Sequence, residues 1–251
     1  MIPAAPAATL VVMRDAPSRA PDLLMLERAG NMAFAPGAMV FPGGQVDPGD
    51  HVVAADRALT DPLDDLEDAA ARVAAIRECI EEVGVAVGFA AAPEEISALR
   101  AGLHAGNEFG TMIRSRGLRL DLAALTPFAR WRPNLRETRV FDARFYIAEA
   151  PDDADIVADG GESVRAIWAT ADHILAEADR GRIRVIFPTR RNLERLATFA
   201  GLADARSHAA SFPVQLITPW LEERGGEEWL CIPDGLGYPV TSEPLRTAMR
   251  G

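Results

Sequence analysis

Residues 77–85 are the most constraining segment of the chain, with the sequence Arg-Glu-Cys-Ile-Glu-Glu-Val-Gly-Val. At about 100° per residue, Glu78, Glu81 and Glu82 fall within about 100° of arc on one face of a helix. Apolar residues take the opposite face, at the spacing of a buried stripe, and these are Val73, Ile76, Ile80 and Val83. The pattern predicts an amphipathic helix over about 67–83, which Gly84 terminates.

The three carboxylates on this helix repel one another, because like charges at i, i+3 and i+4 cost about a few tenths of a kcal/mol per pair. Their concentration on one packed helix indicates that a positive group lies among them. A hard divalent cation such as Mg²⁺ takes oxygen ligands of this kind. The sequence therefore predicts a metal site on the polar face of the helix.

The overall charge narrows the classes of partner. A net charge of −11 argues against binding along nucleic acid, which needs a basic face. A polyanionic small substrate is compatible with this charge, since a bound metal and a few arginines reverse the local potential. All 26 basic side chains are arginine, which excludes a lysine Schiff base or a phosphate-loop lysine.

The sequence also indicates a compartment. No apolar run is long enough to span a bilayer, and the first residues lack the charged and apolar regions of a signal peptide. Cys79 and Cys231 are far apart and match no metal-ligand spacing. A reduced, cytoplasmic setting without membrane contact is the expectation.

Short strands and helices mix along the chain, which favours one α/β domain over 1–251 with a helical insertion. The expected strands lie at 9–13, 22–27, 35–44, 126–131, 138–148 and 163–168, the first two as a hairpin. Further helices are expected at 171–180 and 189–200, and an interrupted helical segment at about 90–125. Residues 45–66 are expected to form a loop with one helical turn, and 212–238 irregular strands.

Gly43 and Gly44 precede the acidic helix, and together the two elements resemble the Nudix box. That pattern is Gly, five residues, Glu, seven residues, then Arg-Glu-apolar-x-Glu-Glu-x-Gly-apolar. Its second half is matched at 77–85, with Cys79 in place of an aliphatic residue. In the first half Gly44 matches and Asp50 stands where the family has Glu. The 26 residues of 51–76 replace the usual seven, which leaves the role of Asp50 open.

A long insertion at this place is similar to the branch of the family that includes the peroxisomal coenzyme A diphosphatases. The segments 32–44, 131–133 and 139–146 also resemble that branch. The resemblance implies a Nudix-type α/β/α sandwich with a mixed sheet. It places the box insertion at about 51–66 and an extra helical segment at about 90–125.

Residue roles follow from the same resemblance. It implies catalytic roles for Arg77, Glu78, Glu81 and Glu82, with Arg77 orienting a carboxylate through a bidentate pair. The metal, Mg²⁺ or Mn²⁺, would be held by Glu78, Glu81, Glu82 and Gly44. The general base is either a glutamate of the box or a later acid, for which Glu162 is the candidate. Candidate substrate-binding residues are Arg28, Gly43, Arg132 and Arg139.

Other residues are assigned no chemistry. Trp131 and Phe141 are placed to stack on adenine, but core packing is the simpler expectation for each. The four histidines show no ligand spacing and are expected to lie apart from the site; they are His51, His104, His173 and His208.

The resemblance implies a metal-dependent hydrolase of a nucleoside diphosphate derivative, with coenzyme A or an acyl-coenzyme A as the first expectation. ADP-ribose, a dinucleotide or a nucleotide sugar is the alternative substrate. A Nudix-fold sensor that binds nucleotides without cleaving them is the alternative of another class, although the helical carboxylates are complete. Relatives are often dimers, and a homodimer stays open because the sequence shows no interface.

Overall fold

Two long neighbouring strands, β1 (Ala5–Ala16) and β2 (Arg19–Arg28), form the centre of the fold. The structure is a computed structural model that describes residues 4–30, 35–133, 140–152, 154 and 156–248. The two strands pair antiparallel, with Met13 opposite Leu23. The predicted hairpin is therefore confirmed, and both strands extend beyond the predicted ranges.

A mixed sheet is built around this hairpin. Its strands follow the order β3-β2-β1-β6-β5-β8, while β4 also pairs with β1 and β7 with β2. The pairs β1–β6 and β5–β8 are parallel and the others antiparallel. The remaining strands of the sheet are β3 (Met39–Val40), β4 (Gly43–Gln45), β5 (Thr126–Trp131), β6 (Phe141–Glu149), β7 (Ser163–Ala169) and β8 (Leu216–Ile217).

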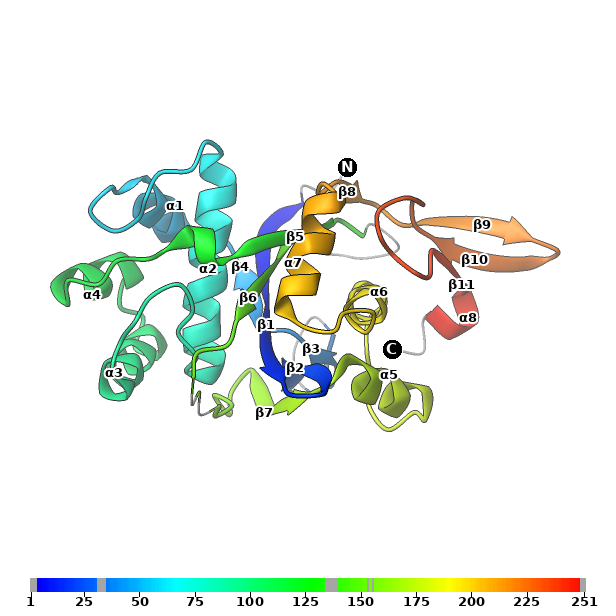
Figure 1. Ribbon diagram of the computed structural model, residues 1–251, viewed down its shortest axis with the longest axis horizontal. Coiled ribbons are helices and arrows are strands. Elements are labelled where there is room, and N and C mark those ends of the chain that lie inside the picture. The colour runs from blue at the N-terminus through cyan, green and yellow to red at the C-terminus, as the bar shows by residue number, and fades with distance from the viewer. Residues whose placement is uncertain (1–3, 31–34, 134–139, 153, 155, 249–251) are drawn as a thin grey trace.

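Helices cover both faces of the sheet (Figure 1), which gives the expected α/β/α sandwich. Along β1, Leu10 and Val12 face a core shared with α2 (Leu66–Val83), while Val11 and Met13 face the opposite core. A strand that is buried on both faces needs a continuous apolar run rather than alternation.

Helix α2 carries the acidic motif and matches the predicted range to within one residue. Asp65 caps its N-terminus by accepting hydrogen bonds from the amides of Glu67 and Asp68. Gly84 ends it in the left-handed conformation at φ 72°, which glycine adopts without strain. The predicted apolar stripe of this helix is fully buried.

The first face is completed by elements on either side of α2. Residues 48–55 form two turns of helix, α1, instead of the single turn expected in this region, because Asp47 and Asp50 make a capping box at its start. The expected helical segment after α2 forms two helices and a 3₁₀ turn. These elements are α1 (Pro48–Ala55), α3 (Pro93–His104), α4 (Phe109–Ser115) and η1 (Leu122–Ala124).

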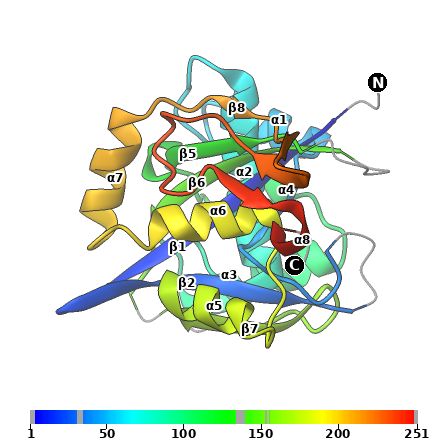
Figure 2. The same cartoon turned by 90° about the vertical axis from the view of Figure 1, so that its right-hand side faces the viewer.

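The second face is covered by the C-terminal part of the chain (Figure 2), where a small antiparallel sheet, β11-β10-β9, joins the helices. Helix α6 begins before Pro188, because proline is tolerated in the first turn of a helix. Helix α7 was not predicted, since its alanine-rich sequence has no clear apolar stripe. These elements are α5 (Ala171–Asp179), α6 (Phe187–Leu196), α7 (Leu202–Ser211), β9 (Trp220–Arg224), β10 (Glu227–Cys231), β11 (Ser242–Pro244) and α8 (Leu245–Ala248).

One further difference concerns a short element. The single strand expected over 35–44 is two short strands, β3 and β4, separated by Phe41 and Pro42. Within the described part of the chain, no helix has the length and apolarity needed to cross a bilayer.

Candidate active site

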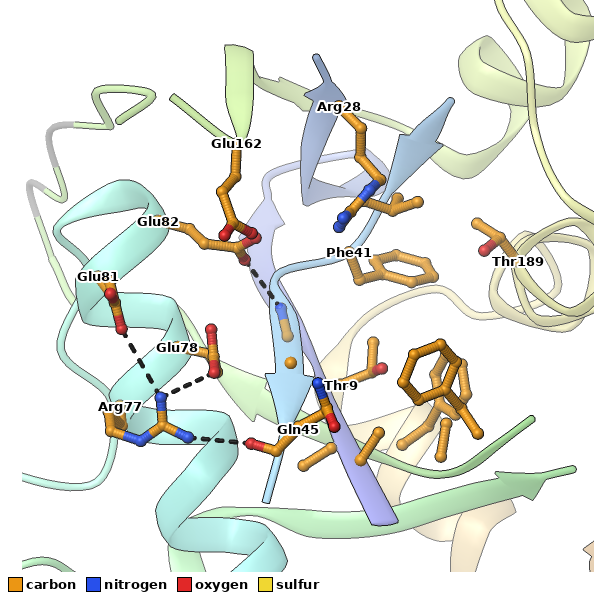
Figure 3. Close-up of a pocket in the computed structure, with 18 of the residues that line it drawn as sticks. Thr9, Arg28, Phe41, Gln45, Arg77, Glu78, Glu81, Glu82, Glu162 and Thr189 are labelled. Carbon is orange, nitrogen blue, oxygen red and sulfur yellow. Dashed lines mark hydrogen bonds and ion pairs between the residues drawn. The ribbon is translucent and has the colours of Figure 1, made fainter. Parts of the chain in front are cut away.

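A cavity of about 560 Å³ lies where α2, the β1–β4 pair and the first turn of α6 meet (Figure 3). The carboxylates of α2 form one wall. Aromatic and apolar side chains form much of the rest, and these include Val40, Phe41, Phe141, Phe145, Ile186 and Pro188. The cavity therefore brings together a charged wall and an apolar wall.

Glu82 is the most buried of the three glutamates, with 4% of the residue exposed. Its Oε2 accepts a hydrogen bond from the Gly43 amide at 2.9 Å, which joins α2 to β4. Burial raises the pKa of Glu82 well above its ordinary value, although the Gly43 hydrogen bond opposes the shift. An ionised Glu82 therefore needs a positive charge nearby. The Gly43 amide donates to Glu82, so it can contact a substrate, as predicted, only by giving up this hydrogen bond.

Glu78 lies beside the guanidinium of Arg77, with 2.7 Å between Oε1 and an Nη atom. Burial raises the pKa of Glu78 to about 7, against the opposing effect of Arg77. Gly44 packs directly against this carboxylate: a Cβ at Gly44 would lie 2.4 Å from the carboxyl carbon of Glu78. The glycine is therefore required by close approach, and it holds Glu78 in place from the β4 side.

Asp50 contacts Arg77 even though the long insertion separates the two residues in the sequence. Its carboxylate accepts two hydrogen bonds from Arg77, at 3.0 Å from Nε and 2.9 Å from Nη2. Asp50 is 1% exposed, and one of its oxygens also accepts from the Asp47 amide at 2.9 Å. Arg77 in turn donates to the Gln45 carbonyl at 3.0 Å. The expected bidentate pairing of Arg77 is present, and Asp50 supplies it despite the insertion.

Glu81 is the most exposed of the three glutamates and lies 3.6 Å from Arg77. The carbonyl groups at the end of α2 are held by helix α3: Arg100 donates to the backbone carbonyls of Glu81 and Glu82 at 3.0 and 2.8 Å. His104 Nε2 lies 2.9 Å from the same Glu81 carbonyl and lines the cavity. The expectation that His104 lies apart from the site is therefore wrong, because the 90–125 segment folds back onto the end of α2.

Glu162 lies at the mouth of the same cavity, near Glu82 and Arg28 (Figure 3). Strand pairing explains its position, since Ser163 pairs with Arg28 and the Ala29 amide donates to the Glu162 carbonyl at 2.8 Å. Asp159 fixes the loop by accepting hydrogen bonds from the amides of Gly161, Glu162 and Ser163. Asp159 also lines the cavity, and no sequence pattern pointed to it.

Of the three arginines predicted to bind substrate, Arg28 and Arg132 lie within the described residues. Arg132 is half-exposed, and its guanidinium is 4.0 Å from the Asp142 carboxylate. Its neighbours Trp131 and Pro133 line the cavity, but Arg132 does not. Arg139 lies outside the described residues. Arg28, by contrast, lines the cavity at the end of β2.

The charge of the cavity constrains what can bind there. Among the described residues, six carboxylates and two arginines line it; the acids are Asp47, Glu78, Glu81, Glu82, Asp159 and Glu162. A diphosphate would be repelled by this wall unless cations entered with it. The donor set is all oxygen, which suits Mg²⁺ or Mn²⁺.

The geometry is compatible with such a cation. Within the described residues, no three carboxylate, histidine or thiolate groups already surround one point. Mg²⁺ rarely needs such a cage, since it keeps several waters and binds through one or two carboxylates together with substrate phosphates. The residues therefore fit a metal that arrives with its substrate.

Trp131 lines the cavity and is joined to Tyr238, which lies outside the cavity lining. The indole N–H of Trp131 donates to the Tyr238 hydroxyl at 3.1 Å, and this hydroxyl donates to Asn192 Oδ1 at 2.8 Å. Trp131 also packs edge-to-face on Tyr238 and Phe187, at 5.7 and 6.1 Å between ring centroids. Trp131 is buried, so the expectation of core packing is confirmed for it, although it also touches the cavity. The same expectation is wrong for Phe141, which is half-buried and lines the cavity.

We expect Tyr238→Phe to lower the free energy of unfolding by about 2 kcal/mol, because it leaves a buried donor on Trp131 and a buried acceptor on Asn192. Urea denaturation measures this loss. Combining Tyr238→Phe with Trp131→Phe in a double-mutant cycle isolates the Trp131–Tyr238 hydrogen bond. A loss below about 0.5 kcal/mol would contradict the proposed support of the wall.

The mixed-sheet sandwich of this chain is the fold of a class of hydrolases of known structure. A NUDIX hydrolase from Alicyclobacillus acidocaldarius is 30% identical over 82% of this chain and 97% of its own, with a TM-score of 0.73. The chain therefore belongs to the Nudix hydrolases, which are enzymes of the pyrophosphatase type.

Other comparisons are weaker. The MutT protein from Methanosarcina mazei Go1 is 15% identical over 77% of this chain and 93% of its own, with a TM-score of 0.45. The Nudix hydrolase RenU from M. smegmatis is 16% identical over 84% and 89%, with a TM-score of 0.42. The membership in the Nudix hydrolases rests on the Alicyclobacillus acidocaldarius structure and not on these two. No family model and no curated protein matches the chain.

Proposed function

We propose that the protein hydrolyses the diphosphate linkage of a nucleoside diphosphate derivative with the help of Mg²⁺ or Mn²⁺, and that coenzyme A or an acyl-coenzyme A is its substrate. The observation that carries the hydrolytic part is the wall of Glu78, Glu81 and Glu82 at a cavity large enough for a nucleotide derivative. The long insertion in the box supports the coenzyme A part.

Glu78, Glu81 and Glu82 would hold the metal, with Gly44 beside them. A bound divalent cation supplies charge neutralisation and acidifies water. Arg77 orients the glutamates rather than touching substrate, because Asp50 and Glu78 occupy its guanidinium. Glu162 is the candidate to take the proton of the attacking water. Water adds to one phosphorus and the bridging P–O bond breaks, which gives two phosphate monoesters.

The test is hydrolysis of a substrate panel with Mg²⁺ or Mn²⁺, followed by chromatography of the products. The panel contains coenzyme A, acetyl-coenzyme A, ADP-ribose, NADH and a nucleotide sugar. Cleavage of coenzyme A to 3′,5′-phosphorylated adenosine and phosphopantetheine, abolished by EDTA, would support the proposal. Cleavage of ADP-ribose or NADH alone would contradict the coenzyme A part. Binding without cleavage of any of them would favour a sensor.

Gly44→Ala is expected to lower kcat/KM by about 10²-fold, because the new methyl group displaces the Glu78 carboxylate by roughly an ångström. Gly44 has ordinary backbone angles, so the effect is steric and not conformational. Gly49→Ala is the matched control, since nothing lies within 4 Å of a Cβ there. Equal activity of the two variants would show that Glu78 needs no support from β4.

A further inference from the structure

Thr189, in the first turn of α6, is a buried polar side chain without a partner. The residue is 4% exposed and lines the cavity. Its hydroxyl makes no hydrogen bond to any described residue, although a threonine in a helix can usually bond a preceding backbone carbonyl. Figure 3 shows the hydroxyl on the side that faces Phe41, across the cavity from Glu78 and Glu82.

Within the described residues, the backbone amides on either side of Pro188 have no hydrogen-bond partner either. Ile186 is the N-cap of α6 and provides no side-chain hydrogen bond to the first turn. The amides of Phe187 and Thr189 are in the first turn, where no carbonyl of the helix can accept from them. Pro188, between them, has no N–H. Two amides and one hydroxyl therefore stand at one end of the helix, where the helix dipole favours an acceptor atom.

The surroundings of Thr189 are apolar. Ile186 and Pro188 precede Thr189 in the chain and line the cavity with it, and Figure 3 shows Phe41 and the one charged neighbour labelled on this side, Arg28. The fully buried unpaired side-chain atoms of the described residues do not include Thr189 Oγ1, so this hydroxyl is open to the cavity, where an acceptor atom of a ligand can take the place of water. An apolar wall with one group of donors selects a ligand that is mostly apolar or planar and carries one acceptor oxygen.

We propose that the first turn of α6, through Thr189, binds an acceptor oxygen on the part of the substrate that lies beyond the diphosphate. The substrate class is then a diphosphate whose distal group is largely apolar or planar and bears a carbonyl or phosphate oxygen. This subsite rests on the proposed function, because it needs the diphosphate to lie against the carboxylates of α2. Thr189 determines specificity and leaves the chemistry of hydrolysis to the opposite wall.

Thr189→Val tests the subsite, since valine keeps the shape and removes the hydroxyl. Dissociation constants would be measured by calorimetry with Mg²⁺ for coenzyme A, NADH, ADP-ribose and ADP. The measurements use Glu162→Gln protein, which lacks the candidate base and keeps the three metal-binding glutamates, so that binding is separated from turnover. Thr189→Ser restores the hydroxyl, and Thr198→Val removes an exposed hydroxyl from beyond the other end of α6, outside the cavity. Melting temperatures check that each variant is folded.

We expect Thr189→Val to weaken the tightest of the three extended ligands by about 10-fold and ADP by less than 2-fold. Thr189→Ser should bind within about 3-fold of the parent, and Thr198→Val should bind equally well. A dependence on Thr189 for coenzyme A but not NADH would identify a phosphate or pantetheine oxygen, and the reverse would identify the carboxamide. Either result supports the subsite.

Equal weakening of all four ligands, or no weakening of any, would overturn the subsite. If the wild-type protein cleaves no member of the panel but binding still depends on Thr189, the proposed function is overturned and the subsite is kept. No binding of any ligand to the Glu162→Gln protein would overturn the subsite, and no cleavage by the wild type in addition would overturn both.

Discussion

Glu82→Gln should lower kcat by at least about 10³-fold while the protein stays as stable as the wild type or becomes more stable. Activity falls because a neutral amide is a poor ligand for a hard cation, and a metal contributes several kcal/mol of charge stabilisation to such a reaction. Stability is kept because the amide oxygen of glutamine can still accept from the Gly43 amide at the 2.9 Å now spanned by Glu82.

The stability arm of this prediction has a definite sign. The pKa of Glu82 is raised by burial, so folding favours its protonated form and an ionised Glu82 opposes folding at neutral pH. Removing the charge removes that cost. Thermal denaturation and steady-state kinetics on the cleaved substrate measure the two arms. Glu67→Gln is the matched control on the same helix, since its side chain is 64% exposed and outside the cavity.

An active Glu82→Gln protein, within about 10-fold of the wild type, would show that Glu82 holds no metal. An inactive protein that is also strongly destabilised would show that the Gly43–Glu82 contact has a structural role that glutamine cannot fill. Only inactivity combined with retained stability agrees with a functional carboxylate.

Asp50→Asn should lower the free energy of unfolding by about 3 kcal/mol and reduce activity as well. Arg77 is buried, and Asp50 holds two of its nitrogen atoms. Removing one charge of a buried pair leaves the other uncompensated, which typically costs about 3–5 kcal/mol. The isosteric amide keeps one acceptor, which places the expected loss at the lower end of this range. Glu78 would then take a larger share of the Arg77 charge.

Asp47→Asn is the control for this variant, because Asp47 lies 3.5 Å from the same guanidinium but its side chain is 63% exposed. An exposed ion pair is worth about 0–1 kcal/mol, so the control should change stability little. Urea denaturation of both variants measures the contrast. Equal losses would mean that burial does not strengthen the Asp50–Arg77 pair.

The sequence predicted best where the determining contacts are local. The α2 helix, its terminating Gly84 and its buried stripe follow from one periodic segment of 18 residues. The hairpin of β1 and β2 follows from two apolar runs around a turn. The grouping of three glutamates on one face follows from helix geometry alone, which is why that wall of the cavity could be predicted.

The rest of the cavity depends on contacts between distant segments. Thr189 and His104 have no local pattern around them, and the fold brings both to the wall of the cavity that α2 begins. The role of Asp50 could not be predicted from its spacing, because 26 residues separate it from Arg77. Strand pairing could have located Glu162, but only once the β2–β7 register was known.

The segment between α1 and α2 is attached at both ends by independent contacts. Arg77 holds Asp50 on one side, and Asp65 caps α2 on the other. Most of the 26 residues are helical or buried, since α1 and α2 include 51–55 and 66–76, and Leu59 and Thr60 are 3% and 1% exposed. The contact between Arg77 and Asp50 therefore does not depend on the length of the exposed part of this segment.

This independence makes the exposed stretch at Asp61 and Pro62 an insertion point for protein engineering. A reporter or affinity domain grafted there would leave both attachments in place, as domain insertions do when they enter exposed loops.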